Sequence, residues 1–422
     1  MDNISTAKRK DTDISIADQI RQYRQRYTRV LKRLKNKSVI TVAFQVIHRS
    51  IWKYDRIYHL MDQDPFFDPV VFVCPYLREG KKQMLEEMNA TCELMSSKGY
   101  KIIKTYDERN NSWIDVREQV QPDIVFFSVP FDYTKDQYRI HHFTDSLSCY
   151  VPYFFTTNGK EGGNYDGPFH NLVWCNFYET DIHKRYAQKY ARNNAENVVV
   201  SGYPQLDDFL YESADSVSDP WPLKDHKKII WAPHHTIDGQ GQGLNYSTFK
   251  RYHAVFKEIA REYADHIQIA FKPHPMLKEK LYKDEEWGKG RTDYYYQFWD
   301  DVENGLLEQS DYTDLFLTSD ALIHDCSSFM AEYLSTSKPA LYLLHDDNVD
   351  SRLHEFGKMA LENHYHARDV EDIHAFVESQ VLKGRDPMQK ERLQFIDQHL
   401  KAGNGKPASK NIVNYIKTMI KG

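Results

Sequence analysis

The sequence lacks three features that would mark a membrane-spanning, a zinc-binding or a nucleic-acid-binding protein. No run approaches the roughly 18 consecutive apolar residues of a membrane span, and residues 1–13 carry charges where a secretion signal needs an apolar stretch. The five cysteines are scattered, odd in number and without CxxC spacing, which indicates reduced thiols and no zinc site. A net charge of −6 argues against bulk binding to nucleic acid. We therefore expect a cytoplasmic protein that binds no nucleic acid.

A basic amphipathic segment opens the folded part of the chain. Apolar residues recur at three- and four-residue steps between Ile16 and Leu34, so we expect a helix with one apolar face. The other face carries Arg21, Arg24, Arg26, Arg29, Lys32, Arg33, Lys35 and Lys37. Such a helix can lie on anionic lipid, and it can equally pack on its own domain with its basic face in water. Peripheral contact with an anionic membrane through residues 16–37 is therefore one of two expectations.

Short apolar runs that alternate with helical segments fill the rest of the chain. In the first half they are Val39–Ile47, Pro69–Leu77, Tyr100–Tyr106, Pro122–Pro130, Cys149–Thr157 and Leu172–Tyr178. The pattern restarts with Lys227–Thr236 and Ile267–Pro275, after a polar, proline-containing stretch at residues 212–228 that we interpret as a linker. Runs of this kind are typical of parallel strands in βαβ units.

The length and the pattern together predict an α/β fold with two Rossmann-like, doubly wound domains that face a cleft, preceded by the amphipathic helix. A chain of 422 residues is too long for one ordinary core and suggests two domains of roughly 200 residues each. The expected boundaries are 1–37 for the basic helix, 38–211 for the first domain and 227–395 for the second. Residues 396–422 are expected to form a helix that packs back on the first domain.

Three strands of the second half end in histidines or in an acid-plus-hydroxyl cluster. The residues are His234 and His235, then His274, then His324, Asp325, Ser327 and Ser328. In doubly wound folds, ligands bind at the carboxyl ends of the strands. A histidine can donate to a phosphate or take up a proton near neutral pH, and Lys272 would add a positive charge. We expect these side chains to form one site.

The stretch Ser319–Leu344 reads as a strand, a tight polar turn, a helix and a second buried strand. Hydroxyls and free backbone N–H groups at a helix start favour an anion, which suggests a pyrophosphate beside Ser327 and Ser328. The alternative is that Asp325 or Ser327 is only an N-cap. The acidic pairs at 207–208, 300–301 and 346–347 lack a ligand pattern, so we interpret them as solvated surface charge and expect no metal.

Five segments in order resemble those of a known family. They are Gly202–Phe209, Ile229–Thr236, Phe271–Pro275, His324–Leu343 and Asn404–Ile416. The resemblance, over about residues 196–420, is to the CDP-glycerol:poly(glycerophosphate) glycerophosphotransferases. It implies a GT-B fold and transfer of glycerol phosphate from CDP-glycerol to a hydroxyl at the inner face of the membrane.

The resemblance also implies roles for single residues. His274 matches the histidine of the family's histidine–proline motif, associated with catalysis or with binding of the transferred phosphate. Asp325, Ser327, Ser328 and Glu332 match the helix start taken to hold the donor pyrophosphate and ribose. Glu332 also lies just over one helical turn after Ser328, so it could reach a sugar hydroxyl at the same end.

The chain departs from the family at one position. Members carry a histidine–glycine pair at the end of a first-domain strand, and this chain has Asn158 and Gly159 there. An amide is no base at neutral pH, so His141 and His142, with Asp132 behind them, are candidate replacements or else ordinary surface histidines. The nearby glycines, Gly159, Gly162, Gly163 and Gly167, suggest a loop around the acceptor or the donor, or only a flexible loop.

The expected function is transfer of glycerol phosphate from CDP-glycerol to a teichoic acid-like or capsule-like polymer, or to its lipid-linked precursor, without any cofactor beyond the nucleotide-activated donor. The candidate residues are His274, His234, His235 and His142 for catalysis; Asp325, Ser327, Ser328, Glu332, Lys272 and His324 for the donor; and Asn158, Gly159, His141 and Asp132 for the acceptor. The alternatives are a GT-B glycosyltransferase that uses a nucleotide sugar and a non-catalytic scaffold of a polymer-synthesis complex.

Overall fold

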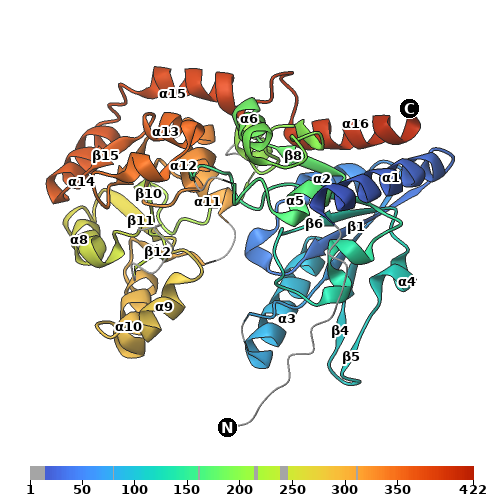
Figure 1. Cartoon of the computed structure of the whole chain (residues 1–422). Helices are drawn as coiled ribbons and strands as arrows, with labels where there is room; N and C mark the ends of the chain where they lie inside the picture. The colour runs from blue at the N-terminus through green and yellow to red at the C-terminus, as the bar shows by residue number, and fades with distance from the viewer. Residues whose placement is uncertain (1–14, 79, 160–161, 213–216, 238–245, 310–311) are drawn as a thin grey trace, which may run out of the picture.

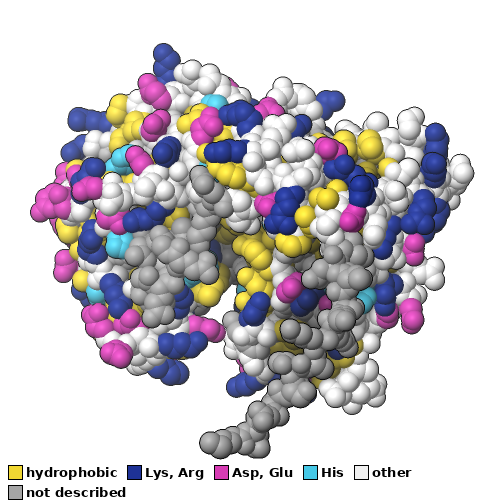
Figure 2. Space-filling view, in the orientation of Figure 1, with side chains coloured by type: hydrophobic (Ala, Val, Ile, Leu, Met, Phe, Trp, Pro, Cys, Tyr) yellow, Lys and Arg dark blue, Asp and Glu magenta, His cyan; other side chains and the backbone are white. Residues whose placement is uncertain are grey.

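Two parallel sheets, one in each half of the chain, organise the molecule (Figure 1). The computed structural model describes residues 15–422 except 79, 160–161, 213–216, 238–245 and 310–311. The expected linker at 212–228 therefore lies partly outside the described residues, and its last two residues belong to a strand. The space-filling view shows a notch between the two lobes (Figure 2).

The first sheet has seven strands in the order β3-β2-β1-β6-β7-β8-β9, and the strands in it are parallel. Their bounds are β1 Ile40–Val46, β2 Phe67–Val73, β3 Ile102–Lys104, β6 Ile124–Phe127, β7 Leu147–Tyr150, β8 Cys175–Tyr178 and β9 Val198–Val200. A small antiparallel hairpin, β4 Tyr106–Asp107 with β5 Ser112–Trp113, stands apart from it.

The second sheet has six parallel strands in the order β12-β11-β10-β13-β14-β15. Their bounds are β10 Lys227–Ala232, β11 Ile267–Phe271, β12 Gly305–Leu307, β13 Ala321–His324, β14 Ala340–Leu343 and β15 Tyr365–Ala367. Both sheets thus follow the doubly wound order 3-2-1-4-5-6, and the first adds a seventh strand. The two-sheet α/β prediction is confirmed.

Helices connect the strands of each half. In the first half they are α1 Ile16–Leu34, α2 Asp55–Asp62, α3 Lys81–Ser97, α4 Val116–Val120, α5 Pro168–Leu172, α6 Asp181–Tyr190 and α7 Leu206–Tyr211. In the second half they are α8 Phe249–Glu262, α9 Leu277–Lys283, α10 Gly288–Asp301, α11 Thr313–Thr318, α12 Phe329–Glu332, α13 Glu355–Leu361, α14 Val370–Phe376, α15 Gln389–Phe395 and α16 Ala408–Lys421. Among the residues that the structure describes, no helix is both long enough and apolar enough to cross a bilayer.

Two strand predictions near the cleft are wrong in their bounds. The run Cys149–Thr157 was expected to be a strand throughout, but β7 ends at Tyr150 and a loop follows. Pro152 in that loop has no N–H for the sheet ladder. The run from Leu172 begins in α5, which has Pro168 in its first turn, so β8 starts only at Cys175.

Helix α1 packs on the first domain. Ile20, Tyr27, Val30 and Leu34 on its apolar face are buried, and the hydroxyl of Tyr27 lies 2.8 Å from the carbonyl of Leu172, to which it donates. The apolar face is therefore not available to lipid in this arrangement. Its basic face stays on the surface, so membrane contact through charge remains a prediction.

Helix α16 crosses back to the first domain, where Ile412, Ile416 and Ile420 join its core. The carboxylate of Asp207, in α7, accepts hydrogen bonds from the N–H groups of Ala408 and Ser409 at the start of α16. Asp207 is only 1% exposed. The surface-charge interpretation is thus wrong for Asp207, because its carboxylate satisfies the unpaired donors of a buried helix end.

Candidate functional site

Three histidines meet at the carboxyl ends of β10 and β11. The strands are paired neighbours, with Trp231 beside Phe271, so the residues that follow them share one edge of the sheet. The ring centroid of His235 lies 4.3 Å from that of His234 and 4.2 Å from that of His274. The sequence predicted this convergence, and the structure brings the three rings together.

Hydrogen bonding fixes which nitrogen of His274 carries the proton. Its Nδ1 accepts from the backbone N–H of Met276 at 3.1 Å, so a neutral ring has its proton on Nε2. Burial, with the neighbouring His234 and His235, lowers the pKa of His274 well below its usual range. Burial and His235 act likewise on the pKa of His234. The rings of His234 and His274 are therefore neutral, and a bound anion would favour their charged form.

Asp325 is a structural carboxylate behind this cluster. It is fully buried and accepts from the N–H of His234 and from the N–H and hydroxyl of Thr248. Burial raises its pKa to about 6 although these donors favour the charged form. Asp325 thus joins the end of β10 to the start of α8. The alternative that it caps its own helix is wrong. Among the contacts of described residues, Asp325 contacts the histidine cluster only by accepting the hydrogen bond from the backbone N–H of His234.

The helix expected after Ser328 is short. α12 comprises four residues and continues as a 3-10 turn, Tyr333–Thr336. Ser328 precedes it with helical dihedral angles and without a side-chain capping bond. A helix of four residues has only a small macrodipole. The phosphate interpretation therefore depends on the histidines and on the half-buried Ser327 and Ser328, and not on a helix end.

A polar network crosses the cleft beside these serines. The hydroxyl of Tyr312 donates to the buried carboxylate of Glu332 and accepts from Nζ of Lys53 at 2.8 Å. Lys53 belongs to the first domain, in the connection between β1 and α2. From the second domain, Nζ of Lys272 lies 6.0 Å from the ring centroid of Tyr312. Sequence reasoning missed Lys53 and Tyr312. Lys53 lies seven residues beyond the end of β1, after a 3-10 turn at Arg49–Ile51, so the rule that ligands bind at strand ends did not point to it.

His324 does not join the histidine cluster. Its Nδ1 lies 3.1 Å from the carbonyl of Cys326, and its ring packs 5.2 Å from the rings of Tyr342 and His364. Burial lowers its pKa to about 3, so the ring is neutral. No contact of His324 among the described residues supports a role in donor binding.

Asn158 and Gly159 lie where the two domains meet. The N–H of Gly159 donates to the carbonyl of Arg352 at 2.7 Å, and the N–H of His354 donates to the carbonyl of Thr157 at 3.1 Å. The hydroxyl of Thr157 donates to the carbonyl of Ser327 at 3.0 Å. We call these three bonds the domain seam. They place Asn158 beside the serine turn, although it offers no base.

His141 and His142 form a different cluster. Both lie in a 3-10 turn, Ile140–His142, and their Nε2 atoms are 3.2 Å and 2.7 Å from the carboxylate of Asp136. Asp132 pairs instead with Arg139 at 3.2 Å. The prediction that Asp132 stands behind the two histidines is therefore wrong: Asp136, on the preceding turn, takes that place.

Both clusters have the donor atoms of a cation site. In His234, His235 and His274, and likewise in Asp136, His141 and His142, one ligand atom from each residue lies within 4.8 Å of the others. Neutral imidazoles at this spacing can bind a metal, and they can equally donate N–H groups to an anion. The expectation that no metal is needed remains a prediction.

Two Rossmann-like domains with strand ends facing a shared cleft define the GT-B type of transferase fold. The wall teichoic acid polymerase TagF has this fold with a TM-score of 0.60 at 15% identity, over 96% of this chain and 98% of that chain. The MnaA–UDP co-structure from Staphylococcus aureus gives a TM-score of 0.56 at 16% identity, over 90% and 96%.

The sequence gives the family. Residues 171–418 match the sequence model of the CDP-glycerol:poly(glycerophosphate) glycerophosphotransferases, and this match covers more than half of the chain. The chain belongs to this family. The match begins before residue 196, where the resemblance was expected to start, and therefore takes in β8 of the first domain.

Relatives with curated names are teichoic acid polymerases. The ribitol-phosphate polymerase TarK of Staphylococcus aureus is 24% identical over 308 residues, 68% of this chain and 53% of the relative. The poly(ribitol-phosphate) polymerase of Bacillus spizizenii is 29% identical over 182 residues, 42% of this chain and 27% of the relative. The chain spans about half the length of the first relative and less of the second.

Proposed function

We propose that the protein transfers glycerol phosphate from CDP-glycerol to a hydroxyl of a teichoic acid-type polymer or its lipid-linked precursor. The observation that carries the proposal is the cluster of His234, His235 and His274 at the ends of β10 and β11, in a chain of this family. Ser327 and Ser328 follow β13, the neighbour of β10 in the same sheet. Such a cluster offers several N–H and O–H donors to one diphosphate.

The reaction follows from these donors. The Nε2–H of His274 and the serine hydroxyls bind the donor's pyrophosphate, and the imidazoles stabilise the negative charge that develops on the leaving group. The acceptor oxygen attacks the phosphorus that bears glycerol, the P–O bond to CMP breaks, and CMP leaves with the electron pair. The proton of the acceptor hydroxyl passes to a base. No metal takes part in this scheme.

The proposed place of action is the cytoplasmic face of the membrane. Lys and Arg side chains of α1 are exposed while its apolar face is buried, so attraction to anionic lipid would come from charge. The polymer end or its lipid carrier would supply the acceptor hydroxyl there.

The test is nucleotide release from a donor panel with the purified protein. CDP-glycerol, CDP-ribitol, and UDP-, GDP-, CDP- and CMP-sugars would each be incubated with a synthetic glycerol phosphate oligomer. We expect CMP release and oligomer extension with CDP-glycerol. Release from a nucleotide sugar instead would support the glycosyltransferase alternative, which Asn158 in place of a histidine favours. No release from any donor would support the scaffold.

A further inference from the structure

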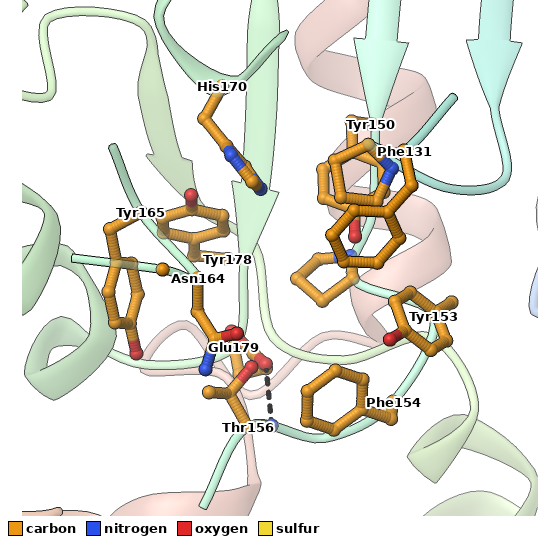
Figure 3. A pocket seen from close by; sticks show the side chains of 13 residues that line it. Phe131, Tyr150, Tyr153, Phe154, Thr156, Asn164, Tyr165, His170, Tyr178 and Glu179 are labelled. Atoms are coloured by element: carbon orange, nitrogen blue, oxygen red, sulfur yellow. Dashed lines mark hydrogen bonds between the residues drawn. The ribbon is translucent and has the colours of Figure 1, made fainter. Parts of the chain in front are cut away.

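A pocket lined with aromatic rings opens in the first domain, at the carboxyl ends of β6, β7 and β8 (Figure 3). The space between its rings and at its mouth, open solvent included, is about 350 Å³. Its rings come from Phe131, Tyr150, Tyr153, Phe154, Tyr165 and Tyr178. The other polar residues of the lining are Thr156, Asn164, His170 and Glu179. Ring walls with a few fixed polar groups suit a ligand with both C–H and O–H faces, such as a polyol.

Glu179 is the carboxylic acid in the lining of this pocket. It follows β8 directly, is 4% exposed, and accepts a hydrogen bond from the N–H of Thr156 at 3.1 Å (Figure 3). Burial raises its pKa to about 7. A carboxylate with such a pKa can take up a proton at neutral pH and release it again.

No cation compensates Glu179 among the titratable neighbours that the structure describes. They are Tyr150, Tyr165, Tyr178, Tyr203, His170 and His183. Burial lowers the pKa of both histidines to about 4, so they are neutral at pH 7, and burial raises the pKa of each tyrosine. Burial therefore raises the pKa of Glu179 without a neighbouring positive charge that would lower it.

One short loop joins this pocket to the donor side. Thr156, which bonds Glu179, is followed by Thr157, which donates to Ser327. Asn164 of the pocket donates from Nδ2 to Oδ1 of Asn158 at 2.8 Å. The pocket therefore lies beside the position at which this chain lacks the expected histidine.

We propose that Glu179 is the general base of this transferase and that the aromatic pocket holds the polyol end of the acceptor. The inference rests on the proposed function. The carboxylate takes the proton of the acceptor hydroxyl while the hydroxyl oxygen forms its bond to phosphorus and the P–O bond to CMP breaks. CMP leaves with the electron pair, and Glu179 then loses the proton to water. Asn158 orients Asn164.

The test is Glu179→Gln in the full chain. The amide oxygen still accepts from Thr156, but it cannot take up the proton. We expect kcat to fall about a hundredfold or more, with the KM for the donor nearly unchanged. The acidic limb of the pH–rate profile near pH 7 should also disappear. Glu179→Asp, which keeps a base at a shifted position, should retain that limb with an intermediate kcat.

Asp207→Asn is the matched control, because it removes another buried carboxylate whose pKa burial raises. Asp207 contacts α16, so its loss should lower the melting temperature and leave the pH–rate profile as it is. A Glu179→Gln variant that folds and keeps more than a third of the wild-type kcat, or keeps the acidic limb, would overturn the assignment of Glu179.

A donor-free arm separates this inference from the proposed function. Binding of a glycerol phosphate oligomer would be followed by saturation-transfer NMR in the wild type, Phe154→Ala and Tyr165→Ala. We expect binding that both substitutions weaken at least fivefold. If the wild-type protein releases nucleotide from no donor, the proposed function and the base role of Glu179 are both wrong. Oligomer binding that both substitutions weaken would still support the pocket. Absent binding, or equal binding in all three proteins, overturns the pocket.

Discussion

The two sheets share one strand order, yet their carboxyl ends carry opposite chemistry. The second sheet ends in nitrogen and hydroxyl donors, with His234, His274 and Ser327 as members. The first ends in a carboxylate among aromatic rings, Glu179. Donors suit the anionic half of a group-transfer reaction, and a carboxylate suits the alcohol half. The two domains have similar folds, and the side chains at their strand ends decide which chemistry each domain can support.

Burial favours the neutral form of the titratable side chains at the carboxyl ends of both sheets. It lowers the pKa of His274 and raises that of Glu179 to about 7, because removal from water disfavours charge of either sign. A neutral imidazole gains charge when an anion binds, and a carboxylate of raised pKa holds a proton readily. One physical cause therefore underlies both the proposed phosphate site and the proposed base.

The largest loss of activity is expected from His274→Ala, on the donor side. We expect kcat to fall about a hundredfold, since one donor to the developing charge is lost. The matched control is His266→Ala, because His266 is exposed at the opposite end of β11, just before Ile267. Equal activities of the two variants would show that the histidine cluster is not the donor site.

The pH dependence of stability tests whether burial raises the pKa of Glu179. The pKa of Glu179 is about 7 in the folded protein and near 4.3 when unfolded, so its stabilising contribution is complete below about pH 4.3 and is lost as the pH rises to 7. Glutamine does not ionise. Between pH 4 and 8 we expect Glu179→Gln to gain about 2 to 3 kcal/mol in unfolding free energy relative to wild type.

Urea unfolding at both pH values measures this gain. Glu355→Gln, on an exposed carboxylate of α13, is the control and should give a difference near zero. A constant difference between Glu179→Gln and wild type would mean that burial does not raise the pKa of Glu179.

The domain seam that joins the two halves can be tested with Gly357→Ala. An added Cβ would lie 2.2 Å from the carbonyl oxygen of Thr157, so the seam must shift. We expect a loss of about 1 to 3 kcal/mol in unfolding free energy, measured in urea. Gly403→Ala, with nothing within 4 Å of the added atom, is the control. Equal stability of the two variants would contradict the tight approach at the seam.

The basic face of α1 gives a smaller effect. Lys32→Gln removes one exposed charge without touching the buried apolar face, and we expect about fivefold weaker sedimentation with anionic liposomes at low salt, from roughly 1 kcal/mol per charge. Lys390→Gln, on α15 of the second domain, should sediment like wild type. Identical binding of both variants would assign α1 a purely structural role.

The smallest expected effect is that of metal removal. If His234, His235 and His274 bind phosphate as N–H donors, EDTA should leave kcat unchanged, and added Zn²⁺ should raise the KM for the donor by occupying the same nitrogens. Loss of activity in EDTA that Zn²⁺ or Mg²⁺ restores would replace the anion site with a metal centre.

Local patterns were enough to predict the alternating strands and the histidines that follow β10 and β11. Parallel strands bring their carboxyl ends to one edge, so His234 and His274 could be placed together without coordinates. The same rule put Asp325 at that edge but could not tell that its carboxylate turns inward to Thr248. The direction of a side chain depends on packing that the pattern does not contain.

The fold class, the family motifs and the meeting of His234, His235 and His274 could be predicted from the amino-acid order alone, because strand periodicity and residue order are local properties of the chain. Only the tertiary structure decided which groups lose contact with water. It buried Asp207 under α16, joined Lys53 to Tyr312 across the cleft, and placed Glu179 among aromatic rings. Burial and pKa depend on neighbours far apart in sequence, so the candidate base became visible only in the folded chain.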